Sequence, residues 1–347
     1  MKLLKTQYKP LESVLKTDVL MEFVESVLAG DRLALARLLS LIENQEESGF
    51  EALAALYART GRAHIIGVTG APGTGKSTLV NGLAKAFRQS DDNGNQSSAT
   101  VGVIAVDPSS PFSGGAILGD RIRMRDLAGD PGVFVRSMAS RGTLGGLAST
   151  TAGVAQALDA AGFDLILIET VGAGQAEVDI ARTAHTTIVV SAPGMGDEVQ
   201  AIKAGIMEIA DILVVNKADL PGAESAVRAL QATLEMGRSL NSNDVAQDEM
   251  QWTVPVLTAI STQGEGFDNL LDAIIQHRQY LHASEQWGMR ERERIRFELD
   301  LLLRENLVKS FFNTQPDGVY AALVDQVIAR EISPWQAVQN LIAGEER

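Results

Sequence analysis

The chain has 347 residues, of which 45% are hydrophobic, and its formal net charge is −14. This length can hold one large α/β domain with additions or two domains, and the acidic charge argues against nucleic acid or an anionic membrane as the main partner. The absence of cysteine excludes a disulfide framework, a thiolate metal site and a cysteine nucleophile. Neither a signal peptide nor a membrane span is visible, so we expect a cytoplasmic protein.

Residues 1–60 are predicted to form a helical extension. Apolar residues recur at helical spacing, and breaks at Gly30-Asp31 and near Ser48-Gly49 predict two or three helices. Asp31 is the predicted N-cap of the second helix. A stabilising cover for the sheet is the simpler role for this extension, and a separate binding module is the alternative.

A phosphate-binding loop follows a short apolar run, His64 to Thr69, which reads as a buried strand. Its glycines let backbone N–H groups converge on a phosphate at the start of a helix. Lys76 is the predicted catalytic cation at the terminal phosphates, and the Ser77 hydroxyl can bind Mg²⁺. The predicted nucleotide contacts here are Gly70, Ala71, Pro72, Gly73, Thr74, Gly75, Lys76, Ser77 and Thr78.

Two acidic residues end predicted buried strands. Asp107 follows the strand from Val101, and Glu169 follows the strand from Phe163. The carboxyl edge of a parallel sheet is where α/β folds bind ligands, so both residues are candidates for holding Mg²⁺. Asp120 closes a glycine-rich loop of the kind that switches with the nucleotide, and it is placed to reach the metal or the attacking water.

A base-reading signature, Asn216-Lys217-Ala218-Asp219, ends a later strand. The Asp219 carboxylate can accept hydrogen bonds from N1–H and the exocyclic amine of guanine. Adenine lacks both donors, so such a site can reject ATP by up to roughly 10⁴-fold. Ile260, Ser261 and Thr262 follow the last predicted strand, where the second guanine contact is expected.

A further switch is predicted between these motifs. The Gly194-Met195-Gly196 loop leads into a helix, and capping alone could explain Asp197 near its start. Lys203 is either a surface charge or a cation that a partner moves toward the developing negative charge. The motifs contain no obvious arginine finger, although Arg121 or Arg123 could serve, so slow intrinsic hydrolysis is expected.

Residues 283–347 are charged and are predicted to form a helical arm. An apolar stripe that a helix cannot bury alone often pairs with a second subunit. The predicted organisation is therefore a helical extension over residues 1–60, a P-loop GTPase domain over residues 61–282 and a dimerisation arm over residues 283–347. The GTPase domain is an α/β fold with a mostly parallel central sheet flanked by helices.

Taken together, these motifs resemble the methylmalonyl-CoA mutase-associated GTPases, also called MeaB or ArgK-like, in the metallochaperone-type group of P-loop GTPases. The resemblance covers nearly the whole chain. The segment between Asp107 and Met124 makes it specific, because that segment is not a general GTPase feature. The matching motifs lie at residues 67–77, 106–110, 114–120, 169–175 and 216–219.

The resemblance implies a homodimeric GTPase that acts as a chaperone for an adenosylcobalamin-dependent acyl-CoA mutase, such as methylmalonyl-CoA mutase. It would gate cofactor loading and protect the mutase, with the cobalamin adenosyltransferase as a second partner. By motif position, the switch at residues 197–203 responds to the mutase. Relatives commonly have Ser-Ala where this chain has Ile260-Ser261, and backbone N–H groups can still contact guanine there. The implied magnesium ligands are Ser77, Asp107, Asp120 and Glu169.

Two other functions stay open. A metal-insertion GTPase chaperone would carry a Cys or His cluster for its cargo, whereas this chain has no cysteine and its histidines are scattered in the sequence. An ATP-dependent kinase of a transport protein is the other alternative, and Asp219 argues against it. The four histidines are His64, His185, His277 and His282.

Overall fold

The computed structural model describes residues 11–89, 99–108, 125–127, 129–140, 146–170, 175–194, 207–241, 251–316 and 318–343. The chain divides into two compact units, Met1–Glu298 and Leu299–Arg347. None of the helices within the described ranges combines the length and the apolar content needed to cross a lipid bilayer.

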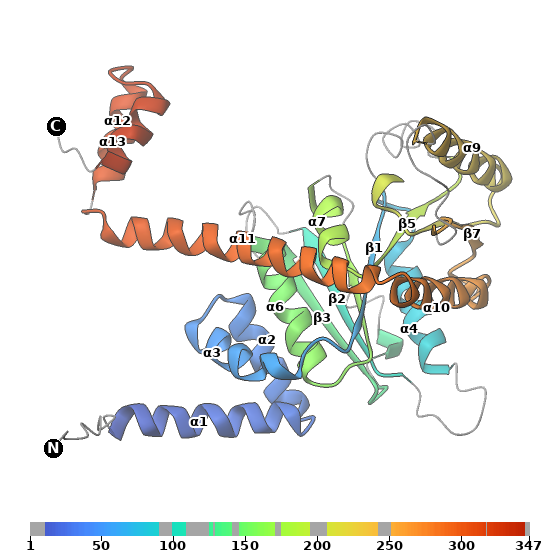
Figure 1. The fold of residues 1–347 in the computed structure, drawn as a ribbon, viewed down its shortest axis with the longest axis horizontal. Helices are drawn as coiled ribbons and strands as arrows, with labels where there is room; N and C mark the ends of the chain where they lie inside the picture. The colour runs from blue at the N-terminus through green and yellow to red at the C-terminus, as the bar shows by residue number, and fades with distance from the viewer. Residues whose placement is uncertain are drawn as a thin grey trace. The chain divides into compact units, whose positions relative to one another are not determined.

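The first unit is built on a parallel seven-stranded sheet with the strand order β3-β2-β4-β1-β5-β6-β7 (Figure 1). Strands β1, β4, β5 and β6 are buried along their whole length. This explains their continuous apolar runs, because a parallel sheet is covered on both faces. The predicted α/β fold is confirmed. The strands are β1 His64–Thr69, β2 Val101–Pro108, β3 Val133–Ser140, β4 Leu165–Glu169, β5 Thr186–Ser191, β6 Ile212–Asn216 and β7 Val256–Ala259.

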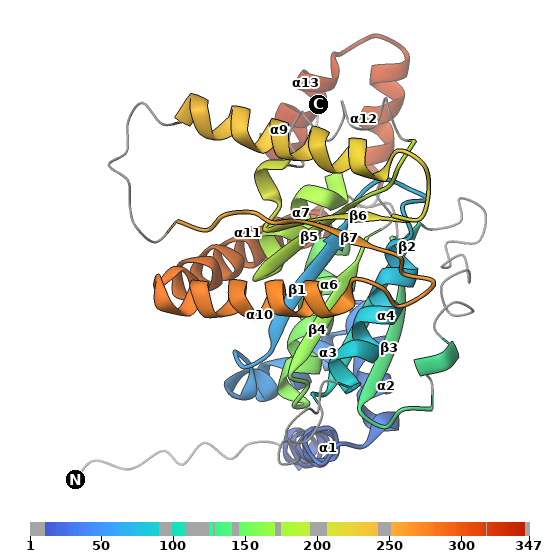
Figure 2. The same cartoon turned by 90° about the vertical axis from the view of Figure 1, so that its right-hand side faces the viewer.

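Helices cover both faces of the sheet. Figure 2 looks onto the face covered by α4 (Lys76–Gln89) and α10 (Phe267–Ala283). The other face carries α6 (Gly146–Ala160), α7 (Gln175–Thr183) and, beside β6 and β7, α9 (Ala223–Asn241). Neighbouring strand residues point to opposite faces, so Ile66 packs in the core beneath α4 and Ile65 in the core beneath α6.

The N-terminal extension contains α1 (Leu11–Leu28), α2 (Arg32–Glu43) and α3 (Glu47–Leu56). Asp31 caps α2 as predicted, because its carboxylate accepts hydrogen bonds from the N–H groups of Leu33 at 2.8 Å and Ala34 at 3.3 Å. The predicted break near Ser48-Gly49 is wrong, since both residues lie inside α3.

The break between α2 and α3 falls instead at residues 44–46, where Gln45 takes the left-handed conformation with φ 56°. Gly49 is needed for packing rather than for a turn, because a Cβ atom there would lie 2.8 Å from Cβ of Leu41. Leu38, Ile42 and Leu53 share one buried core with residues of α6. The extension therefore packs over α6.

The ends of β3 and α9 also differ from the sequence prediction, and for β3 a contact with another helix explains the difference. Strand β3 continues to Ser140, although the apolar run stops at Val135. Arg136 can remain within the strand because its guanidinium pairs with Glu43 and Ser40 of α2. Helix α9 runs to Asn241 instead of ending near Leu234.

The arm begins with α11 (Gln286–Thr314), which is longer than the predicted helix over residues 290–306. Its first thirteen residues belong to the first unit, which ends at Glu298. The second unit continues with α12 (Val319–Ile328) and α13 (Pro334–Ala343).

A glycine in α4 provides a test of the core on the α4 face. A Cβ atom at Gly82 would overlap the ring of Phe267, which is buried in α10. We expect Gly82→Ala to lower the free energy of unfolding by about 1–3 kcal/mol, because the closed core has to shift. Thermal unfolding measures the effect.

Gly288→Ala in α11 is the matched control, since nothing lies within 4 Å of the added Cβ atom. Alanine is the better helix former, so this variant is expected to be unchanged or more stable by at most about 1 kcal/mol. Equal stability losses in the two variants would contradict the packing argument.

Candidate nucleotide site

The P-loop lies at the carboxyl edge of the sheet, between the end of β1 and the start of α4. Gly70, Gly73 and Gly75 have φ angles of 135°, 82° and 92°. Side chains are strained at these angles, and a Cβ atom on Gly70 would also overlap the carbonyl oxygen of Val190 in β5. The glycines of the motif are therefore required by the path of the backbone.

Lys76 lies within the curve of this loop. It is 6% exposed, and its ammonium donates hydrogen bonds to the carbonyl oxygens of Gly70 at 2.7 Å and Ala71 at 2.9 Å. The positive charge is thus held at the loop itself. Its location suits a cation that balances the negative charge of phosphates in the loop.

Ser77 and Glu169 are brought together by the sheet. The Ser77 hydroxyl donates a hydrogen bond of 2.6 Å to Oε1 of Glu169, and both residues are buried. The parallel pairing of β1 with β4 sets Val68 opposite Glu169, which places the carboxylate beside the P-loop. A hydroxyl and a carboxylate are oxygen ligands of the kind that Mg²⁺ prefers.

The other predicted site residues near the phosphates are described only in part. Asp107 is the seventh residue of β2, where it pairs with Ala139 of β3, and its side chain is outside the described set. Strand β2 also pairs with β4, so Asp107 belongs to the strand next to that of Glu169. Asp120 and Lys203 lie outside the described residues.

Thr69 and Thr170 are site residues that the sequence analysis missed. Both are buried, and their hydroxyl groups are 3.1 Å apart in a hydrogen bond. The N–H group of Thr170 also donates to the carbonyl oxygen of Val68 at 3.2 Å. These contacts tie the chain just after Glu169 to the last residues before the P-loop. A threonine directly before Gly70 and another directly after Glu169 were the available signal.

Asn216 joins the base-reading motif to the P-loop. Its side-chain amide donates to the carbonyl oxygen of Thr74 at 2.8 Å. Its Oδ1 accepts from the N–H group of Ser261 at 3.1 Å and from the Ser261 hydroxyl at 2.7 Å. The Ser261 side chain is therefore engaged with Asn216, which orients the amide.

Lys217 adds a second link between the two loops. It has φ 56°, and its ammonium donates a 2.7 Å hydrogen bond to the carbonyl oxygen of Gly73. Asp219, two residues further on, is exposed at the surface and available to a ligand. Ile260 pairs with Glu265 through a 3.1 Å backbone hydrogen bond, which closes the loop that carries Ser261 and Thr262.

A groove of about 870 Å³ runs between α4 and α10 from this loop. Thr78 of α4 and Ser261 and Thr262 of the loop line one part of it. Residues from all three predicted nucleotide-contact segments, the P-loop, the Asn216 motif and the loop at 260–262, therefore meet at one edge of the sheet.

The four histidines, which are scattered in the sequence, are gathered in the fold. His64 starts β1, His185 precedes β5, and His277 and His282 lie on α10. They lie near the amino ends of the strands, away from the P-loop. Within the described part of the chain, no group of three or more His, Cys, Asp or Glu side chains is arranged to hold a metal ion.

The fold and the nucleotide site define the class as a P-loop GTPase. The family model described as "Methylmalonyl Co-A mutase-associated GTPase MeaB" matches residues 35–316. The chain belongs to this family.

Named relatives agree with this assignment. A Pyrococcus abyssi protein named as a GTPase is 43% identical over 321 residues, covering 92% of this chain and 95% of the relative. GTPase ArgK of Escherichia coli is 32% identical over 327 residues, covering 93% of this chain and 95% of the relative. The mitochondrial methylmalonic aciduria type A homolog of Mus musculus is 30% identical over 278 residues, covering 80% of this chain and 64% of the mouse protein.

A solved structure described as an LAO/AO transport system kinase shares the fold. Its TM-score is 0.65 at 24% identity, and the match covers 94% of this chain and 97% of that structure. The family match and the named GTPases, rather than this structure, make the chain a GTP hydrolase with a nucleotide-binding P-loop.

Replacing Lys76 tests the phosphate end of the site. We expect Lys76→Ala to lower single-turnover GTP hydrolysis by at least about 10²-fold, because a cation at the β- and γ-phosphates stabilises the transition state by several kcal/mol. Lys85→Ala, on the same helix but paired with the exposed Asp126, is the control and should retain hydrolysis. Near-normal hydrolysis by Lys76→Ala would refute its assigned role.

Asp219→Ala tests the base end. Loss of two hydrogen bonds to a charged group, each contributing about 1.5–3 kcal/mol, should weaken GDP binding by at least about 10²-fold and leave weak ADP binding unchanged. Isothermal titration with both nucleotides measures this, with Asp268→Ala on the neighbouring helix as the exposed control. Undiminished GDP affinity in Asp219→Ala would show that this carboxylate does not read the base.

Proposed function

We propose that this GTPase is a Mg²⁺-dependent chaperone of an adenosylcobalamin-dependent acyl-CoA mutase such as methylmalonyl-CoA mutase. It gates cofactor loading and protects the mutase. The observation that carries the proposal is the family match over residues 35–316, because that family is described as associated with methylmalonyl-CoA mutase. The relative named for methylmalonic aciduria type A supports the same client.

The proposed Mg²⁺ site is centred on Ser77 and Glu169. Their 2.6 Å contact places a hydroxyl and a carboxylate, both oxygen ligands, directly behind the P-loop. Asp107 and Asp120 complete the proposed set. Mg²⁺ held by these residues would supply positive charge that neutralises the negative charge developing on the phosphates.

The proposed catalytic groups have separate roles. Lys76 balances charge on the terminal phosphates, in keeping with its position inside the loop. Asp120 would hold Mg²⁺ or orient the attacking water. Lys203 approaches the developing charge when the mutase orders the segment that contains it, and this makes hydrolysis depend on the client.

A homodimer through the arm is part of the proposal. Large apolar side chains are exposed along the second unit, and a helical unit that cannot bury them itself suits pairing with a second copy. The cobalamin adenosyltransferase is the proposed second partner. The exposed side chains include Leu299, Leu303, Leu307, Val308, Phe312, Tyr320, Ile328, Trp335 and Ile342.

The alternatives have less support. A metal-insertion chaperone would need a Cys or His cluster for its cargo, whereas the chain contains no cysteine and, among the residues that the structure describes, its histidines form no group arranged to hold a metal ion. A kinase of a transport protein would need to accept ATP. The Asn216-Lys217-Ala218-Asp219 motif, with Asn216 bound to Thr74, favours guanine instead.

Hydrolysis with and without the mutase tests the proposal. We expect the mutase to accelerate hydrolysis by about 10³-fold or more, as supplying a cation does in other GTPases. Lys203→Ala should keep GDP affinity and basal hydrolysis but lose most of this stimulation. Lys203→Arg, which keeps the cation, should retain a large part of it.

Two outcomes would contradict the proposal. Full stimulation of Lys203→Ala would exclude the role of this lysine. No binding and no stimulation by any adenosylcobalamin-dependent acyl-CoA mutase would exclude the chaperone function itself, while leaving the GTPase assignment intact.

A further inference from the structure

A buried polar chain crosses the amino ends of three strands. His64 Nε2 lies 2.7 Å from the Thr186 hydroxyl, and the same hydroxyl lies 2.9 Å from Nδ1 of His277. Nε2 of His277 is 3.3 Å from Oδ1 of Asp211. With the proton of His277 placed on Nε2, toward this carboxylate, its Nδ1 accepts a hydrogen bond from the Thr186 hydroxyl. The Thr186 oxygen then accepts from Nε2–H of His64.

Asp211 connects this chain to the first turns of α11. Its carboxylate accepts hydrogen bonds from Arg290 of α11 at 2.7 and 2.8 Å and from the N–H group of Thr187 at 2.8 Å. Arg290 also donates to the carbonyl oxygen of His185 at 2.7 Å. The α11 segment is therefore attached to the sheet at two neighbouring strands.

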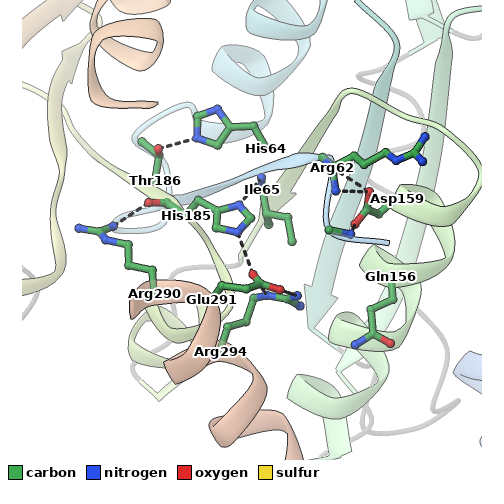
Figure 3. A network of polar contacts seen from close by, with 12 residues as sticks. Arg62, His64, Ile65, Gln156, Asp159, His185, Thr186, Arg290, Glu291 and Arg294 are labelled. Atoms are coloured by element: carbon green, nitrogen blue, oxygen red, sulfur yellow. Dashed lines mark hydrogen bonds and ion pairs between the residues drawn. The ribbon is translucent and has the colours of Figure 1, made fainter. Parts of the chain in front are cut away.

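His185 makes a second attachment, drawn in Figure 3. Its Nδ1 accepts a 3.0 Å hydrogen bond from the N–H group of Ile65, so the proton lies on Nε2, which is 3.2 Å from Oε2 of Glu291. Arg294 holds the same carboxylate at 2.6 and 3.0 Å. A second proton on His185 would have to sit on Nδ1 and would point at the Ile65 N–H group.

An aromatic stack completes the contact. Trp287 of α11 lies between His185, with ring centroids 4.0 Å apart and planes 19° apart, and His282, at 4.4 Å and 18°. His64 is 5.8 Å from the same indole. The four histidines and the first turns of α11 thus form one continuous cluster.

Burial and the charges around this cluster oppose protonation of His64 and His185. Burial, His185, Arg278, His277 and His282 lower the pKa of His64 well below its ordinary value. Burial also lowers the pKa of His185, with Arg294 and Arg290 acting in the same direction and Glu291 in the opposite one.

Asp211 and Glu291 titrate in a lower pH range. Burial instead raises the pKa of Glu298, the last residue of the segment 286–298, which accepts hydrogen bonds from Gln156 of α6. Glu298 therefore favours the closed form as the pH falls. Against the effect of burial, hydrogen bonds from His277 and Arg290 hold the pKa of Asp211 at about 2. Those from His185 and Arg294 hold the pKa of Glu291 at about 2 in the same way. Between about pH 6.5 and pH 4.5, His64 and His185 are therefore the groups that take up protons when the cluster opens.

We propose that this histidine–tryptophan cluster is an acid-sensitive latch that holds residues 286–298 of α11 against the sheet. When the latch opens, His64 and His185 gain water and can be protonated. A histidine that binds its proton more tightly in the open form stabilises the closed form above its ordinary pKa and favours opening below it. Falling pH thus releases residues 286–298 of α11 while the sheet stays folded.

Hydrogen exchange of the full chain at pH 7.5, 6.5 and 5.5, corrected for intrinsic rates, tests the latch. The opening constant of residues 286–298 and of the Ile65 amide should rise by about threefold from pH 7.5 to 6.5. It should then rise by up to about 30-fold from pH 6.5 to 5.5, about fivefold for each histidine. The opening constants of the β4 amides should not rise over the same pH range. An equal rise in β4 would mean global unfolding and would overturn the proposal.

The double variant His64→Gln with His185→Asn should lose the acid response. Gln retains a donor near the position of Nε2 of His64, Asn retains an acceptor near the position of Nδ1 of His185, and neither side chain titrates. His282→Gln, on the exposed face of Trp287, is the matched control and should keep the response. A full acid response in the double variant would refute the latch.

The single variants cover the case in which the double variant does not fold. His64→Gln and His185→Asn should each lower the rise from pH 6.5 to 5.5 from about 30-fold to about fivefold. An unchanged rise of about 30-fold in both single variants would also refute the proposal.

Discussion

The nucleotide site depends on the register between β1 and β4. Five residue pairs, from His64 with Leu165 to Val68 with Glu169, align the two strands. This alignment brings the Glu169 carboxylate to the Ser77 hydroxyl at the first turn of α4. A slip of one residue would turn the Glu169 side chain to the other face of the sheet, because successive strand residues point to opposite sides. The apolar pattern on both faces makes such a slip costly.

The second constraint is the buried polar contact made by Asn216. One amide group satisfies the P-loop through Thr74 and the loop after β7 through Ser261, and Asn216 is 2% exposed. An unpaired polar group at this depth would cost about 1–3 kcal/mol. The pairing therefore holds two segments that lie 142 residues apart, and a base bound between them would meet a preformed surface.

Strand β6 links the two edges of the sheet. The strand ends at Asn216 by the P-loop. At its other end, Asp211 directly precedes the first strand residue, Ile212, and pairs with Arg290 of α11. Buried ion pairs add little net stability but penalise any arrangement that leaves one charge alone. The pair of Asp211 with Arg290, together with the contact of Glu291 with His185, consequently specifies where the first turns of the arm lie. Nucleotide chemistry and arm attachment thus occupy opposite ends of the same strands.

The sequence by itself determined the local features. The P-loop, the buried strands and the Asp31 cap follow from residue spacing, because each depends on neighbours within a few positions, and the alternation of apolar strands with helices along the chain predicts the parallel α/β fold. Only the tertiary structure decided what lies side by side over long separations. It extended β3 past Arg136 by supplying Glu43, and it engaged Ser261 with Asn216. It also gathered His64, His185 and His282 around Trp287 and linked His277 to His64 through Thr186, since packing brings the ends of separate strands and α10 to one edge of the sheet.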